Sequence, residues 1–83
     1  MASFETRVTE IRNRPLGGYT VVVRPHFLET DIDYQKVSLE PHFDNHGASI
    51  AEDHIAFSTD QAPPVYVGQI VTIHAVEPET PSF

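Results

Sequence analysis

Short runs of β-branched and aromatic residues alternate along this chain with segments that contain glycine or proline. The clearest run in the first half is Tyr19–Arg24, and its unbroken apolar centre is typical of a strand that is covered on both faces. The strongest run lies between Val65 and Val76, where a valine-glycine step enters a β-branched segment in the way that small sheets often turn a corner. The pattern predicts a mainly β fold, a small antiparallel barrel or sandwich of about five strands.

Two further segments have the composition of strands. Residues 4–12 alternate with Phe4, Thr6 and Val8 on one face, but Ile11 is out of phase, which suggests a bulge near Glu10. Residues 36–40 alternate as another strand. The segment at 13–18 ends in two glycines and predicts a turn, whereas residues 60–64 end in two prolines and predict a stiff loop.

Residues 49–59 fit two structures. The sequence from Ser49 to Glu52 resembles a helix capping box, so one short helix over residues 50–57 is an alternative. The sequence from His54 to Thr59 instead alternates as a strand that directs Ile55 and Phe57 inward, and the β-like segments on either side favour the strand.

One phrase occurs twice. An apolar strand pattern and a charged residue precede Pro-His-Phe at residues 25–27 and again at residues 41–43. If the strands before the two copies form a hairpin centred near Ile32, Arg24 lies opposite Glu40 and His26 faces Ser38.

The aromatic residues of the repeated phrase have two interpretations. Phe27 and Phe43 would close the two ends of a barrel. Alternatively, Phe27, Tyr34 and Phe43 line an interface or a ligand groove, where aromatic rings contribute strongly to binding.

Length and composition limit the classes of function. A chain of 83 residues forms one domain, expected over residues 1–76 with a flexible acidic tail at 77–83, and its small core leaves little room for an internal active site. It has no cysteine, which excludes disulfide scaffolds and thiol chemistry. We see no signal segment and no apolar run long enough to span a membrane, so we expect a soluble, cytoplasmic protein.

The net charge of −7 is uneven along the chain. Residues 37–83 contain seven acidic residues and no lysine or arginine, whereas residues 1–36 contain five of each sign. This charge repels phosphate backbones, so direct nucleic-acid binding is not expected. An acidic surface could instead imitate nucleic acid and occupy a basic groove on another protein, or could simply be solvated.

Five histidines invite a test for metal binding. The candidate ligands are His42, Asp44, His46 and His54. His42 and His46 would share one face of a helix, but Pro41 and Gly47 make a helix improbable there, and we expect no cofactor.

Catalysis is not indicated either. The neighbouring carboxylates at Asp31 and Asp33, and at Glu52 and Asp53, lie in expected turns, and neither Ser49 nor Ser58 is in a nucleophile-elbow sequence. We therefore predict that the protein is not an enzyme.

The second half of the chain resembles a family of small uncharacterised bacteriophage proteins. The resemblance covers residues 37–76 and rests on Val37-x-Leu39-x-Pro41-His42-Phe43, Ile55-x-Phe57-Ser58-Thr59-Asp60 and Val67-Gly68-Gln69-Ile70-Val71-Thr72-Ile73. The usual proline-glycine turn before the penultimate strand is replaced here by Asn45-His46-Gly47 or Glu52-Asp53. The resemblance implies a phage accessory protein in the host cytoplasm and carries over no site residue.

These observations predict a non-enzymatic, acidic binding module. Its partner would be a host or viral protein, for example a defence or nucleic-acid-handling factor that it inhibits, or it would sequester a small ligand. The predicted binding residues are Phe27, Tyr34, Phe43, Glu52 and Asp53. A virion or assembly component and a histidine-based metal-binding protein are the alternatives. A small sheet with free edges also favours a homodimer.

Overall fold

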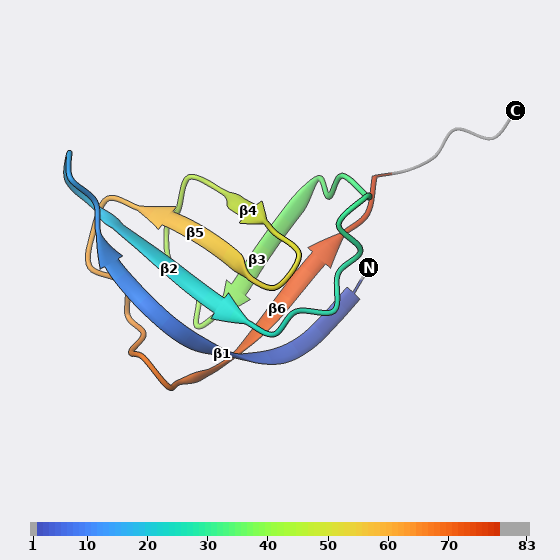
Figure 1. The fold of residues 1–83 in the computed structure, drawn as a ribbon, viewed down its shortest axis with the longest axis horizontal. Coiled ribbons are helices and arrows are strands. Elements are labelled where there is room, and N and C mark those ends of the chain that lie inside the picture. Colours follow the sequence, from blue (N-terminus) through green and yellow to red (C-terminus); the bar gives the residue numbers. More distant parts are fainter. Residues whose placement is uncertain (1, 79–83) are drawn as a thin grey trace, which may run out of the picture.

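The computed structural model describes residues 2–78, which form one antiparallel sheet of six strands that curls into half a barrel (Figure 1). The strands are β1 (Ala2–Asn13), β2 (Tyr19–Arg24), β3 (Lys36–Glu40), β4 (Ala48–Ile50), β5 (Ile55–Thr59) and β6 (Ile70–Val76). Their order across the sheet is β3-β6-β1-β2-β5-β4. The predicted small β fold is confirmed, and the alternative helix over 50–57 is wrong, because β4, a turn and β5 occupy that segment.

The long strand β1 joins the two halves of the sheet. The first half of β1 pairs with β6, and its second half pairs with β2. In Figure 1 the strands β3 and β6 cross the direction of β2 and β5 at a steep angle. The register shifts between Val8 and Glu10, which confirms the bulge suggested near Glu10. In strict alternation Val8 and Ile11 would lie on opposite faces of the sheet, because they are an odd number of residues apart. The extra residue of the bulge shifts the alternation by one position, so both side chains pack against the core.

Strand β2 is central, as its apolar run predicts. It pairs with β1 on one side and β5 on the other, and Val21, Val22 and Val23 are all buried. The turn before it depends on Gly18, whose φ is +87°; a Cβ there would lie 2.6 Å from the carbonyl oxygen of Thr59. Only glycine fits this combination of backbone conformation and close contact.

The predicted hairpin between β2 and β3 is wrong. Strand β3 pairs with β6, so Glu40 lies opposite Thr72 and Ser38 lies opposite His74. Arg24 lies opposite Arg7. The physical reason is that β1 and β5 already occupy both edges of β2, so the segment after Pro25 crosses to the other half of the sheet before β3 begins.

Side chains on the concave face of the sheet form the core. Phe57, Ile55, Ile73, Leu39 and Val8 are among its largest fully buried members. The inward direction predicted for Ile55 and Phe57 is confirmed.

The two phenylalanines of the repeated phrase have different environments. Phe43 is 9% exposed and belongs to the core, as predicted. Phe27 is 70% exposed, so it does not close the other end of a barrel; its ring forms a T-shaped contact with the ring of Phe4 at a centroid distance of 5.3 Å. The peptide bonds that precede Pro25 and Pro41 are both cis.

Strand β6 begins later than the sequence pattern suggests. Residues 65–69 form the corner, and the regular strand starts at Ile70. The N–H of Gly68 donates to the carbonyl of Val8 at 2.7 Å, and the N–H of Val8 donates to the carbonyl of Gln69 at 2.9 Å. With φ of +97° at Gly68, this is a β-bulge that starts at glycine, so the valine-glycine step turns the chain as expected.

No helix within residues 2–78 has the length and apolarity needed to cross a membrane. The predicted tail at 77–83 falls mostly on residues 79–83, which lie outside the described residues.

Candidate binding groove

The two outer strands of the sheet, β3 and β4, border a groove with a volume of about 540 Å³. Its walls are residues 34–38, which lead into and form most of β3, and Ala48 and Ile50 of β4. The loop from His42 to Gly47 closes one end. The volume lies within the range of protein ligand sites, roughly 300–1,000 Å³.

The groove brings together two of the predicted binding residues. Tyr34 and Phe43 both line it. Phe43 forms part of its floor because the ring also packs in the core, whereas the Tyr34 hydroxyl accepts a hydrogen bond from the N–H of Glu29 at 3.2 Å. Aromatic side chains from two separate loops therefore face one hollow surface.

A smaller hollow of about 350 Å³ continues the groove toward the end of β5. It shares residues 43–46 with the groove and adds residues 59–64. Nε2 of His46 lies 2.9 Å from a carboxylate oxygen of Asp60. The buried hydroxyl of Thr59 donates to the carbonyl of Asp44 at 2.8 Å, which ties the loop to β5.

The other predicted binding residues lie away from the groove. Phe27 and Glu52 are exposed and line neither hollow. A carboxylate oxygen of Asp53 lies 2.7 Å from Nδ1 of His54, and the other lies 3.6 Å from a guanidinium nitrogen of Arg24. The hydrogen bond from His54 and, to a smaller extent, the charge of Arg24 lower the pKa of the Asp53 carboxyl.

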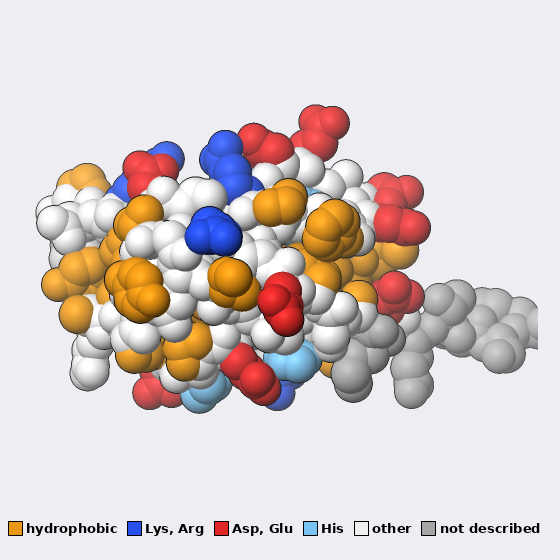
Figure 2. All heavy atoms as spheres, turned by 90° about the horizontal axis from the view of Figure 1, so that it is seen from below, with side chains coloured by type: hydrophobic (Ala, Val, Ile, Leu, Met, Phe, Trp, Pro, Cys, Tyr) orange, Lys and Arg blue, Asp and Glu red, His pale blue; other side chains and the backbone are white. Residues whose placement is uncertain are grey.

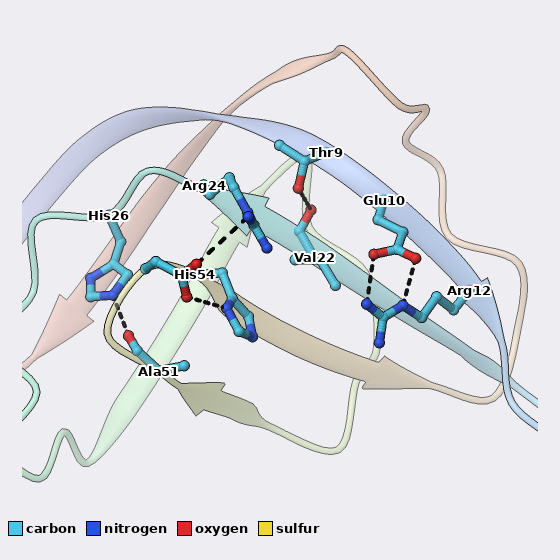
Figure 3. Close-up of polar contacts among 9 residues, drawn as sticks. Thr9, Glu10, Arg12, Val22, Arg24, His26, Ala51 and His54 are labelled. Atoms are coloured by element: carbon cyan, nitrogen blue, oxygen red, sulfur yellow. Dashed lines mark hydrogen bonds and ion pairs between the residues drawn. The ribbon is translucent and has the colours of Figure 1, made fainter.

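The candidate metal ligands are divided in the same way. His42, Asp44 and His46 line the groove, but His54 contacts Asp53 instead. Across residues 2–78, no three histidine or acidic side chains lie close enough to hold one metal ion. His26 bonds through Nε2 to the carbonyl of Ala51, so it links the segment after β2 to the turn after β4 (Figure 3).

A polar cluster that the sequence did not reveal lies on the outer face of the sheet. Nδ1 of His74 is 2.9 Å from Oγ of Ser3, and Nε2 of His74 is 3.2 Å from Oε1 of Glu40. Nε2 is buried and has no hydrogen-bond partner among the described residues, so the Glu40 carboxylate lies beside it without hydrogen-bonding geometry. The only signal in the sequence is that these residues occupy outward positions of three strands, and this becomes useful only once the strand order is known.

Serine, histidine and glutamate in this order resemble a catalytic triad, but the surroundings favour a structural role. The cluster connects β1, β6 and β3 on the outer face of the sheet, where Ser3 is exposed and lines neither of the two hollows described above. A catalytic triad also needs a pocket that holds the substrate beside the nucleophile. The cluster is therefore best interpreted as a connection that holds the outer strand β3 to the sheet.

Hydrophobic side chains gather on another part of the surface, shown in Figure 2. The loop before β6 lies on this side of the molecule in Figure 1, and it contains the exposed residues Tyr66 and Val67. Ile70 at the start of β6 is also exposed.

In comparisons with known proteins, no family model, no curated protein and no solved structure matches the chain.

Proposed function

We propose that this chain is a non-enzymatic binding module whose groove between β3 and β4 receives a basic, partly apolar segment of a protein partner. The observation that carries the proposal is the groove itself, in which Tyr34 and Phe43 meet polar side chains from the loop between the two edge strands. The resemblance of residues 37–76 to small phage proteins extends the proposal to a host protein as the partner.

Charge supports a basic partner. Asp44 and Asp60 line the groove and its continuation, and within residues 2–78 Lys36 is the only lysine or arginine of the lining. Three more acids, Glu29, Asp31 and Asp33, precede Tyr34 at the groove wall. Complementary charge across an interface speeds association and selects partners.

Three of the four arginines lie on other elements and have partners among the described residues. Arg12 forms an ion pair with Glu10 at 2.6 Å, and Arg24 forms one with Asp53 at 3.6 Å. Arg7 donates to the carbonyl of Gly68 at 3.0 Å. Their charges therefore do not offset the carboxylates beside the groove.

The test uses the full chain as bait in a bacterial lysate, followed by calorimetry on each captured protein after purification. We expect Asp44→Lys to weaken binding about tenfold or more, because it turns an attraction into a repulsion at the groove. The matched control is Glu5→Lys, which makes the same charge change at an exposed position of β1. Wild-type binding should also weaken as salt is raised.

A purified partner that binds the Asp44→Lys and Glu5→Lys variants equally well would place the contact elsewhere. Turnover of a substrate that is abolished by a single point change would contradict the non-enzymatic assignment.

A further inference from the structure

The hydrogen-bond pattern of β6 determines which backbone groups of β3 are free. Val8 bonds to Gln69 at 2.9 Å, and the β1–β6 register continues regularly from Arg7 opposite Ile70. In an antiparallel ladder, every second residue of a strand bonds to one neighbour and the residues between bond to the other. Thr72, His74 and Val76 of β6 therefore bond toward β3.

Strand β3 consequently has an open edge. Lys36, Ser38 and Glu40 lie opposite Val76, His74 and Thr72, and they use their N–H and C=O groups in that ladder. Val37 and Leu39 direct their N–H and C=O groups away from β6. No strand covers this side of β3 within residues 2–78, because β3 is the last strand in the sheet order.

The open edge can pair with itself in one register that uses only free groups. In an antiparallel arrangement centred on Ser38, Val37 of one copy lies opposite Leu39 of the second copy, and each such pair exchanges two hydrogen bonds. A shift in one direction would recruit Gln35, whose N–H already donates to Val76 at 3.1 Å. A shift in the other direction would recruit Pro41, which has no N–H.

The same register matches the charges of the strand. Lys36 of one copy lies opposite Glu40 of the second copy, and symmetry repeats this pair on the other side of the axis. Both residues are exposed. They form a non-hydrogen-bonded pair of the new antiparallel ladder, and in such pairs the opposed side chains approach most closely. Any register other than the one centred on Ser38 separates these opposite charges.

We propose that two copies of this chain form a dimer through β3, with Lys36 of each copy facing Glu40 of the other. The two sheets then join into one, and the isologous contact uses β3, the longer of the two outermost strands of the described sheet. The grooves of the two copies border the contact, because residues 36–38 line each groove.

Charge reversal tests the register directly, with sedimentation equilibrium and native mass spectrometry as readouts. Lys36→Glu places four carboxylates at the contact and Glu40→Lys places four ammonium groups there, so each variant alone should dimerise at least about fivefold more weakly than wild type. An equimolar mixture should form a heterodimer, because every opposed pair is then oppositely charged. The Glu5→Lys variant should dimerise like wild type.

Cross-linking supplies a second readout, since the natural chain has no cysteine. Ser38→Cys places two thiols across the two-fold axis at a spacing that a disulfide accepts. It should oxidise to a covalent dimer much faster than Ser49→Cys, a control at an exposed position of β4.

Three results would overturn the inference: a wild-type chain that stays monomeric at millimolar concentration, a dimer that the single reversals do not weaken, and a mixture that does not restore dimerisation. A dimer that survives both reversals but is lost in Val67→Asp would assign the contact to the exposed loop before β6 instead.

Discussion

At the scale of single residues, Asp53 has the clearest electrostatic dependence on folding. The hydrogen bond from His54, with a smaller effect of Arg24, holds the pKa of its carboxyl below the ordinary value. The unfolded chain lacks both contacts and therefore takes up a proton at higher pH. The resulting stabilisation is present above the unfolded pKa, near pH 4, and is lost as the pH falls through the native pKa.

We predict that Asp53→Asn makes the free energy of unfolding depend less on pH in the acid range. Urea unfolding between pH 6 and pH 3 should show a smaller loss of stability for the variant than for wild type, and the difference should be small because the carboxylate is exposed. The control is Glu5→Gln, which removes a carboxylate that takes part in no ion pair of the described residues. Equal pH profiles for Asp53→Asn and wild type would contradict the prediction.

The sequence predicted the environment of a residue correctly where that environment depends only on neighbouring residues in the chain. The inward positions of Ile55 and Phe57 follow from strand alternation, and the position of Ile11 follows from the bulge. Phe27 and Phe43 could not be separated in this way, because both follow Pro-His. Their different exposure arises from the strand order, which places Phe43 over the core and Phe27 beside Phe4.

At the scale of elements, the positions of the strands were predictable and their pairing was not. Residues 36–40 have a strand pattern, but nothing in that pattern shows whether the strand joins β2 or β6. The choice depends on which edges are free after β1 and β5 have paired with β2. The Ser3, His74 and Glu40 cluster was missed for the same reason, because it forms only when β3, β6 and β1 are neighbours.

This cluster leads to a prediction about β3. His74→Ala removes the side chain that contacts Ser3 and Glu40. Loss of the polar contact with Glu40, which at an exposed site is worth at most about 1 kcal/mol, corresponds to at most roughly fivefold faster local opening of β3. Amide hydrogen exchange should accelerate by up to that factor at Lys36, Ser38 and Glu40, which bond to β6, with little change in β5.

The matched control is His54→Ala, which removes a histidine adjacent to β5 on the other half of the sheet. Exchange that rises uniformly across the sheet in His74→Ala would show that the cluster supports the whole fold and not β3 in particular.

At the scale of the whole molecule, the two outermost strands of the sheet formed by residues 2–78 are unequal. Strand β3 has five residues and opposite charges at its two ends, whereas β4 has three residues and no charge. The groove lies between them and could not be predicted from the sequence, because its two walls meet only after the sheet has curled. An edge as short as β4 offers few groups for pairing, which limits further growth of the sheet.

Assembly is therefore expected to stop at two copies. As the concentration of the wild-type chain rises, the mass from light scattering should approach twice 9.3 kDa and then level off. The net charge of −7 per copy opposes association whereas the Lys36–Glu40 pairs favour it, and raising salt from about 0.02 to 0.3 M weakens both effects. The charge-reversal variant Lys36→Glu separates these effects, because it keeps only the repulsion and its association must strengthen with salt. Continued growth of the mass beyond two copies would show that β4 also pairs, and would favour an assembly component over a closed dimer.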